Sequence, residues 1–204
     1  MSFTLPGVKS IAITLSYLLD LIIGDPHWLP HPVKMIGKFI IFLEKKLRSG
    51  DKDYILRING VLLAVIVVGT SIMSTYVLLY FAGKINYILK IIFWVILGYM
   101  SLATKDLFLH GKRILESIKN EDIEGARKNL SLIVGRDTQD LSKEEIITAC
   151  IESIAENTND GIIAPLFYLI LGGPVLAIGY KAINTLDSMV GYKNERYKDF
   201  GWFS

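Results

Sequence analysis

The stretch Gly60–Gly83, GVLLAVIVVGTSIMSTYVLLYFAG, runs for 24 residues without one charged side chain. At about 1.5 Å of rise per residue, a helix of this length crosses a hydrocarbon core of about 30 Å. Apolar residues make up 51% of the 204-residue chain. Soluble domains also reach such a share, so the concentration of apolar residues in one run is the decisive observation. This run predicts an α-helix that spans a membrane.

Two other apolar segments are candidates for further spans. Ile85–Ala103 is interrupted only by Lys90, whose aliphatic stem lets its ammonium reach the membrane interface. Leu5–Ile23 is a weaker candidate because it carries Lys9 and Asp20. We therefore expect an all-α integral membrane protein with about three transmembrane helices.

Basic residues are distributed unevenly around these segments. The link between the first and second segments contains Lys34, Lys38, Lys45, Lys46, Arg48, Lys52 and Arg57, whereas the next link contains only Lys84. By the positive-inside rule the basic loop 24–59 is cytoplasmic, and so is the polar region after Ala103. We expect a multi-pass protein of the plasma (inner) membrane with its site facing the cytoplasm. The net charge of +2 is uninformative, and no nucleic-acid partner is expected.

The pattern changes at Thr104, which divides the chain into membrane-anchoring helices (1–103) and a cytosol-facing helical region (104–204). Two amphipathic stripes follow this boundary. They consist of Leu107, Gly111, Ile114, Leu115 and Ile118, and of Ile123, Ala126, Leu130, Ile133 and Val134. Asn120 is the expected N-cap of the second helix, with Glu121 and Asp122 in its first turn.

A third amphipathic helix is predicted to begin at Lys143. Ser142-Lys143-Glu144-Glu145 is a capping box, in which Ser142 accepts a hydrogen bond from the Glu145 amide and the Glu145 carboxylate accepts one from the Ser142 amide. Leu141 and Ile146 occupy the positions of a hydrophobic staple.

The acidic residues of this helix share one sector. Glu145, Glu152 and Glu156, together with Ala149, lie opposite Ile147, Cys150, Ile151 and Ile154. Acids opposite an apolar stripe usually form a solvated face, which is our interpretation of Glu145. The helix then meets Asn157-Thr158-Asn159-Asp160-Gly161, a turn expected to stop it and to direct several oxygen atoms to one place. Glu156 and Asp160 are therefore predicted to be functional.

A re-entrant helical hairpin is expected over 162–190. Ile162–Leu171 is ten residues long, about 15 Å as a helix, which is too short to span a membrane. Gly172-Gly173-Pro174 suits a tight reversal. The second arm would return Lys181, Asn184, Asp187 and Ser188 to the side where Glu156 and Asp160 lie.

The polar residues of these two segments indicate a site that binds Mg²⁺ and phosphate groups. Glu152, Glu156, Asp160 and Asp187 supply hard oxygen ligands and Asn157 and Asn184 supply amides, a set that suits Mg²⁺. Arg136 and Lys181 are candidate phosphate ligands, with Lys193 as a further cation. His27 and His31 have the i,i+4 spacing of zinc ligands, but the prolines around them exclude the helix that this spacing requires. We expect this segment to form ordered structure at the membrane boundary, and the alternative is that Asp25 or a histidine faces the active site.

The residues alone therefore indicate a membrane-embedded, Mg²⁺-dependent enzyme that acts on phosphate-bearing substrates. GxxxxGK[ST] and GxGxxG are both absent from the sequence. The alternative is a non-catalytic membrane sensor or an ion-coupled carrier, because acids and amides beside broken helices also characterise carriers.

Four motifs follow one another along the chain: GDPHWLPHPV (24–33), VGRDT (134–138), ESIAENTNDGIIAPLF (152–167) and YKAINTLDSMVGY (180–192). In sequence and order they resemble those of the CbiB/CobD family of cobalamin-biosynthesis membrane proteins, the adenosylcobinamide-phosphate synthases. The resemblance covers essentially the whole chain. It implies an ATP-dependent ligase that joins adenosylcobyric acid to aminopropanol phosphate, or to a related amino-alcohol phosphate, through an amide bond.

On this interpretation we assign Glu156, Asp160 and Asp187 to Mg²⁺–ATP, Arg136 and Lys181 to phosphate groups, and Glu152 to the amine as a base. Asn157 and Asn184 are assigned to substrate binding. The partners are then a corrinoid, an amino-alcohol phosphate and the lipid bilayer. Members of the family continue well beyond the point that matches Ser204, so we expect a shortened or split form. Further partners are then a second copy of the chain, in a homo-oligomer, or a complementing C-terminal fragment that supplies missing site groups.

Overall fold

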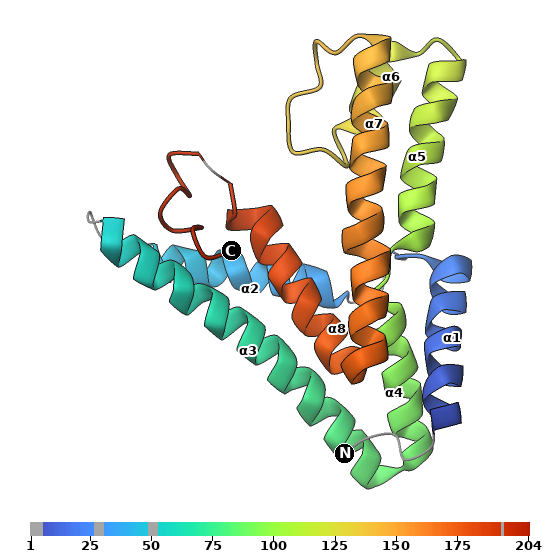
Figure 1. Cartoon of the computed structure of the whole chain (residues 1–204), viewed down its shortest axis with the longest axis vertical. Coiled ribbons are helices and arrows are strands. Elements are labelled where there is room, and N and C mark those ends of the chain that lie inside the picture. Colours follow the sequence, from blue (N-terminus) through green and yellow to red (C-terminus); the bar gives the residue numbers. More distant parts are fainter. Residues whose placement is uncertain (1–5, 27–30, 49–52, 193) are drawn as a thin grey trace.

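The computed structural model describes residues 6–26, 31–48, 53–192 and 194–204, and the regular structure in them is helical (Figure 1). The elements in chain order are α1 (Pro6–Ile23), α2 (Pro32–Leu47), α3 (Asp53–Ile85), α4 (Tyr87–Tyr99), α5 (Thr104–Lys119), α6 (Ile123–Leu130), α7 (Lys143–Thr158), the π-helical turn η1 (Asn159–Ile163) and α8 (Ala164–Val190). Of the residues discussed above, Leu5, His27, Lys52 and Lys193 lie outside the described ranges.

The chain is an all-α membrane protein. Among the described residues, three helical stretches are long and apolar enough to cross a membrane: Asp53–Ile85, Tyr87–Lys119 and Lys143–Val190. The first two confirm the expected spans over 60–83 and 85–103. The third includes the segment for which we expected a hairpin. Helix α3 leaves large apolar side chains such as Val65, Met73 and Phe81 exposed, as a lipid-facing surface requires.

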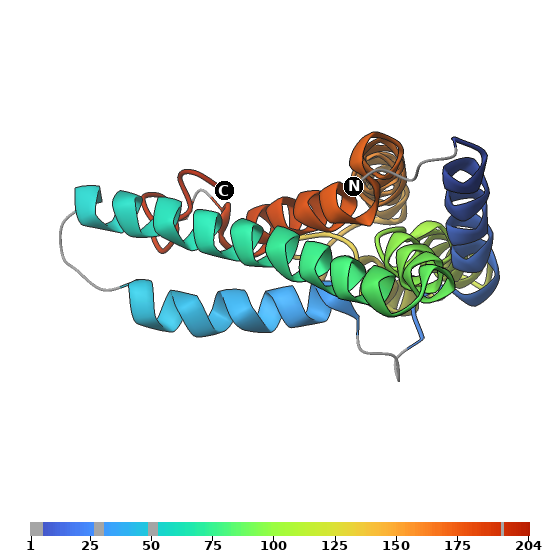
Figure 2. The ribbon, with the colours of Figure 1, turned by 90° about the horizontal axis from the view of Figure 1, so that it is seen from below.

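The region 24–59, which we expected to be a basic loop, contains the 16-residue helix α2. Its start explains the difference. Pro32 occupies the first helical turn, where its missing N–H costs nothing, and His31 is the N-cap, with Nδ1 accepting a hydrogen bond of 3.3 Å from the Val33 amide. The third proline of this segment therefore begins a helix. Figure 2 shows α2 running beside α3.

Three groups of buried apolar side chains hold the helices together. One joins α2, α3 and α8 through residues such as Ile40, Leu63 and Leu186. A second joins α1, α3, α4 and α8 around Trp94 and Leu169. The third lies within α5, α6 and α7. Helix α8 thus packs with the helices of 1–103, although we grouped it with the cytosol-facing region.

Helices α1 and α4 approach closely through small residues. The Ser16 hydroxyl donates to the Val95 carbonyl at 3.0 Å and to the Ala12 carbonyl at 2.9 Å. A Cβ atom at Gly98 would lie 2.6 Å from the Ser16 Oγ, closer than real contacts allow. Small residues are the usual means by which membrane helices bring their backbones together.

We expect Gly98→Ala to lower the melting temperature of the detergent-solubilised protein, since overpacking costs about 1–3 kcal/mol and outweighs the better helix propensity of alanine. Gly69→Ala is the matched control because a Cβ there would meet nothing within 4 Å. Thermal unfolding of both variants checks this, and equal melting temperatures would contradict the close α1–α4 contact.

Helix α7, the last helix of the α5–α7 bundle, begins at the predicted capping box. The Glu145 Oε2 accepts a hydrogen bond of 2.8 Å from the Ser142 amide, the Ser142 Oγ accepts one of 3.3 Å from the Glu145 amide, and α7 starts at Lys143. Leu141 and Ile146 both pack in the core of the bundle. The capping box and the staple are confirmed.

Two details of this bundle differ from expectation. Asp122, not Asn120, is the N-cap of α6, because Glu121 takes a left-handed conformation (φ 58°) and delays the start of the helix. The stripes are also only partly buried: Leu115, Ile147 and Ile151 are exposed, and the buried side of α7 is formed by Ile146, Ala149, Cys150 and Ser153.

Helix α8 is broken at Gly173, as the Gly-Gly-Pro sequence predicts. Gly173 has φ 69° and ψ −162°, which a residue with a side chain rarely adopts, and Pro174 follows it. A Cβ atom at Gly173 would lie 2.9 Å from the Trp94 Nε1. Figure 1 shows the arm before the break continuing the direction of α7 and the second arm turning back beside α3. The reversal carries Lys181 and Asn184 back toward η1.

The residues after α8 fold back onto α2 and α3. The buried Glu44 Oε1 accepts hydrogen bonds from Arg196 Nη2 at 3.0 Å and from Tyr197 Oη at 3.1 Å. Burial and the bond to Glu44 raise the pKa of the Tyr197 phenol. Phe200 is buried in the core of α2, α3 and α8, and its backbone passes directly over Gly60.

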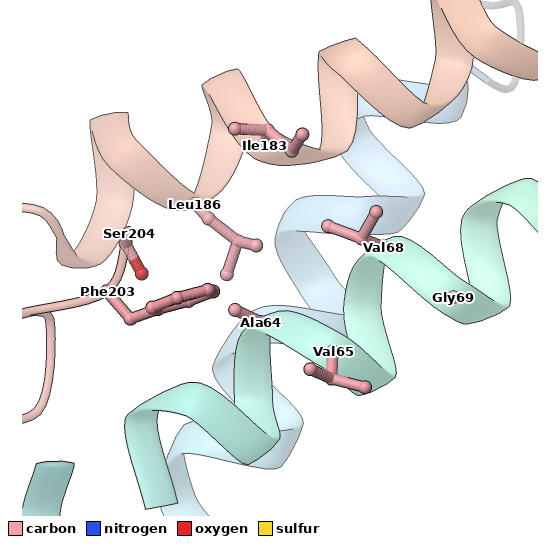
Figure 3. A pocket seen from close by; sticks show the side chains of 8 residues that line it. All are labelled: Ala64, Val65, Val68, Gly69, Ile183, Leu186, Phe203 and Ser204. Atoms are coloured by element: carbon pink, nitrogen blue, oxygen red, sulfur yellow. The ribbon is translucent and has the colours of Figure 1, made fainter. Parts of the chain in front are cut away.

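A pocket of about 370 Å³ lies between α3, the second arm of α8 and the end of the tail (Figure 3). Its wall is apolar apart from the Ser204 hydroxyl and is formed by Ala64, Val65, Val68, Gly69, Ile183, Leu186, Phe203 and Ser204. The residues that we predicted to form the site are not among them.

Candidate functional site

The acidic motif lies at a π-helical turn between α7 and α8. We expected the polar run 157–161 to stop the helix, but the helix continues through it. Asn157 and Thr158 donate to the carbonyls of Ser153 (2.8 Å) and Ile154 (2.7 Å), so their side chains turn back along their own helix. π-helical turns are frequent at functional sites because they re-aim the side chains around them.

Asp160 is the best-connected acid of the motif. Its Oδ1 accepts hydrogen bonds from Asn159 Nδ2 (2.8 Å) and Tyr180 Oη (3.3 Å), and its Oδ2 accepts one from Asn184 Nδ2 (3.2 Å). Tyr180 stacks on Tyr168, with ring centroids 5.1 Å apart. Because Tyr180 and Asn184 belong to the second arm of α8, the reversal at Gly173 brings the last two motifs into contact.

Lys181 is the buried cation of this region. Its residue is 9% exposed, and the carboxylates of Asp25, Asp160 and Asp20 are close enough for their charges to act on its ammonium. An isolated charge in such surroundings would be very costly, so these partners are what allow Lys181 to remain buried.

The end of α1 supplies the opposite side of the site. The fully buried Asp20 accepts a hydrogen bond at Oδ2 from the Thr104 amide (2.8 Å), and its Oδ1 has no hydrogen-bond partner among the described residues. The Asp25 amide donates to Asp106 Oδ2 at 2.7 Å. The Tyr99 hydroxyl donates to the Gly24 carbonyl. These bonds tie the end of α1 to the junction of α4 and α5.

The α4–α5 junction also contacts the π-helical turn. The Ala103 amide donates to the Gly161 carbonyl at 3.1 Å. Asp25 and Asp160 thus come from segments that are both fastened to residues 103–106. The site is built where the apolar spans meet the α5–α7 bundle.

His31 fixes the orientation of Asp25. Its Nε2 lies 3.1 Å from Asp25 Oδ1, without the alignment of an ideal hydrogen bond. Because Nδ1 accepts from the Val33 amide, the proton of a neutral His31 is on Nε2, which faces Asp25. The inner cluster therefore consists of Asp20, Asp25, His31, Asp160 and Lys181.

Sequence reasoning left Asp20 out of the predicted site and kept Asp25 only as an alternative, although a signal was present. Asp20 is the acid that interrupts an otherwise apolar helix, and an ionisable residue in such a segment is a candidate functional residue in itself. Asp25 and His31 stand in the proline-containing motif whose path could not be predicted without the structure.

The other predicted residues lie at the rim of the inner cluster or outside it. Glu152 and Arg136 form an ion pair of 3.4 Å, but their side chains are 65% and 58% exposed, so the pair contributes little stability. Glu156 and Asp187 are exposed, and the charge of Asp187 reaches Tyr180. Asn157 is bonded within α7.

Arg136 nevertheless belongs to a loop that reaches the end of α8. A Cβ atom at Gly135 would lie 3.4 Å from the Tyr192 Oη, so the second motif and the end of the fourth are in contact. Three exposed groups, Arg136, Glu152 and Tyr192, thus stand on this side of the bundle.

The donors present are compatible with a Mg²⁺ ion held mainly by substrate phosphates. No group of three or more His, Cys, Asp or Glu side chains within the described part of the chain is placed to hold a metal ion. The predicted ligands Glu156, Asp160 and Asp187 therefore do not form a closed cage. Mg²⁺ commonly binds to one or two carboxylates together with phosphate oxygens of a substrate. Asp160 and Asp187 could supply the carboxylates.

We expect Lys181→Met to lower stability by about 3 kcal/mol, because it leaves the carboxylates around Lys181 without their buried counter-charge. Methionine has a similar length, so lost packing contributes little. Lys119→Met, at the exposed end of α5, is the control. Thermal unfolding in detergent measures both. An unchanged melting temperature for Lys181→Met would contradict the charge balance described here.

Comparison with known proteins identifies related chains. The family described as CobD/Cbib protein matches residues 13–204. A protein of Listeria monocytogenes serotype 4b (strain F2365), named cobalamin biosynthesis protein CobD, is 47% identical over 191 residues, which cover 94% of this chain and 61% of the relative. Proteins with the same name from Clostridium perfringens (strain 13 / Type A) and Geobacter metallireducens are 47% and 45% identical over 194 and 192 residues.

These alignments cover 95% and 94% of this chain and 61% and 60% of the two relatives, respectively. The chain thus spans about three fifths of the length of the relatives it matches. No solved structure matches it.

Proposed function

Because this chain belongs to the CobD/Cbib protein family, we propose that it acts in cobalamin biosynthesis as an ATP- and Mg²⁺-dependent amide ligase. The substrates are adenosylcobyric acid and aminopropanol phosphate or a related amino-alcohol phosphate, and the product is adenosylcobinamide phosphate. The names of the relatives support the pathway. The observation that supports ligase chemistry is the pair of hydrogen bonds that Tyr180 and Asn184 donate to Asp160 at the π-helical turn, where the charge of Asp160 also acts on the buried Lys181.

The reaction has two balanced steps. A carboxylate oxygen of the corrinoid attacks the terminal phosphorus of ATP, the bond from that phosphorus to the bridging oxygen breaks, and ADP leaves. The amine nitrogen then attacks the acyl carbon, the carbon–oxygen bond to the phosphate breaks, and inorganic phosphate leaves. The nitrogen, which starts as an ammonium, releases two protons. Mg²⁺ would neutralise charge on the transferred phosphoryl group.

The residues of the chain would divide this work by position. Lys181, buried beside the acids, and Arg136, on the exposed loop, would bind phosphate groups. Asp160 with the rim acids Glu156 and Asp187 would hold Mg²⁺–ATP, and Asn184 keeps Asp160 in place.

The remaining two assignments have less structural support. Glu152 stays a candidate base, although it is paired with Arg136. Asn157 is engaged with Ser153 and would need to rotate to reach a substrate.

A carrier or sensor is the second candidate, and the inner cluster supports it too. A buried lysine beside the fully buried Asp20 and the half-buried Asp25 and Asp160, next to apolar spans, is typical of ion-coupled carriers. The two functions differ in one measurable property: only the ligase consumes ATP and forms an amide.

We expect purified protein with ATP, Mg²⁺, adenosylcobyric acid and aminopropanol phosphate to form the amide, measured by mass spectrometry. Asp160→Asn should reduce the rate at least 100-fold and Asp187→Asn at least 10-fold, about 2.7 and 1.4 kcal/mol of transition-state stabilisation. Asp140→Asn, in an exposed loop, should have no effect.

Because the relatives are longer, the assay is run with this chain alone and with the chain co-expressed with the C-terminal part of the Listeria relative. Product in either preparation supports the ligase. Corrinoid binding without ATP turnover in both would favour the sensor or carrier.

The proposed placement is a multi-pass protein of the plasma membrane with a cytoplasmic site. In a Cys150→Ser background, we expect a membrane-impermeant maleimide to label Lys84→Cys in intact cells, but Asp140→Cys only after permeabilisation. Ala155→Cys and Ser188→Cys, on either side of the break at Gly173, should behave like Asp140→Cys. Labelling of Ala155→Cys and Ser188→Cys from opposite sides would contradict the re-entrant hairpin.

A further inference from the structure

We propose that Asp25, oriented by His31, binds the protonated amine of the amino-alcohol phosphate. The inference rests on the proposed function, because that function supplies an amine as substrate. It adds Asp25 and His31, from the first motif, to a site otherwise assigned to residues after 135.

The first argument is the charge balance of the inner cluster. Asp20, Asp25 and Asp160 all act on the ammonium of Lys181, and Asp106 adds a fourth carboxylate whose charge reaches Asp20. Lys105, the neighbouring cation on α5, donates to the carbonyls of Ile22 and Ile23 at the end of α1. Arg113 is a third cation nearby, since it acts on the same His110 as Asp106. Among the described residues the four carboxylates still outnumber these cations, and a cationic ligand would restore the balance.

The second argument is an unmet hydrogen-bonding capacity in a buried position. Asp20 is fully buried, and its Oδ1 is without a hydrogen-bond partner in the described ranges. His31 is 8% exposed, and its Nε2 is directed at Asp25 without a well-aligned bond. Buried polar atoms are rarely left in this state, and at a functional site they commonly await a ligand or water.

The third argument is access. The side chain of Asp25 is 31% exposed, whereas that of His31 is 9% exposed. A ligand can therefore reach Asp25, while Asp20 and His31 act from behind by setting the charge and the orientation. His31 is a positioning residue in this scheme, since Asp25 separates it from the ligand.

The chemistry of the proposed ligand matches this layout. A primary ammonium has N–H donors that suit carboxylate oxygens, and charge-assisted hydrogen bonds of this kind are among the strongest in proteins. The phosphate at the other end of the molecule needs a cation, and the buried Lys181 is in charge interaction with Asp25. One short molecule with opposite charges at its ends would meet both needs.

The test compares aminopropanol phosphate with propanol phosphate, which lacks the amine, by calorimetric binding to the detergent-solubilised protein. We expect the wild-type protein to bind the amine compound at least 10-fold more tightly. Asp25→Asn keeps the shape of the side chain but removes its charge. It should reduce this preference to less than 3-fold while leaving the affinity for propanol phosphate unchanged. Asp140→Asn should retain the preference.

In turnover, Asp25→Asn should raise the KM for the amine at least 10-fold and leave the KM for ATP unchanged. Equal affinity of the wild-type protein for the two compounds would overturn the proposal, whether or not the variant folds. So would a loss in Asp25→Asn that affects both compounds equally. If the preference is present and depends on Asp25 but no amide is formed, the proposed ligase fails while the amine site stands.

Discussion

The ammonium of Lys181 is the charge around which the helices of this protein are arranged. It lies within a packed membrane protein, where an uncompensated charge is not tolerated. Its compensation comes from three places far apart in sequence: the end of α1, the segment that leads to α2, and the π-helical turn. Backbone hydrogen bonds hold these segments together. The Thr104 amide donates to Asp20, and the Asp25 amide donates to Asp106, so the end of α1 is joined to the start of α5.

The break in α8 makes this arrangement possible. Without the left-handed Gly173, the residues after it would continue away from η1, and Tyr180 and Asn184 could not reach Asp160. The returning arm packs its apolar side on α2 and α3 and offers its polar residues to the acidic turn. One conformational requirement at one glycine thus serves both the core and the site.

Local signals in the sequence predicted a large part of the fold. The charge-free run within α3, the capping box at Ser142 and the Gly-Gly-Pro break each have a mechanism that acts within a few residues, and each is found in the structure. Helix α2 was not predicted because all three prolines of this segment were interpreted as helix breakers. Pro32 instead occupies the first turn of α2, where proline is tolerated. The buried stripe of α7 was predicted only in part: Cys150 and Ile154 pack in the core of the bundle, whereas Ile147 and Ile151 are exposed.

Only the site residues that come late in the sequence could be predicted. Asp160, Lys181 and Asn184 stand in polar clusters next to apolar sequence, so the pattern itself draws attention to them. Asp20 and Asp25 join them through tertiary contacts over more than 130 residues, and no spacing rule encodes such a contact. Glu152 and Glu156 were predicted from their place in the acidic motif, but both are exposed and lie outside the inner cluster.

The π-helical turn also has a consequence for the phase of the long helix that contains it. A π turn carries one more residue than an α turn, so the helix after it is rotated by about 100° relative to an uninterrupted one. The stripe of α7 that packs on α5 and α6 therefore does not continue into the stripe of α8 that packs on α4. Deleting one residue from Asn159–Ile163 would restore a regular α-helix. The apolar stripes of α7 and α8 would then be rotated relative to each other, and both could not face their own cores at once. Because of the extra residue, the continuous helix α7–η1–α8 packs into the core of α5, α6 and α7 with one part and into the core around Trp94 and Leu169 with the other.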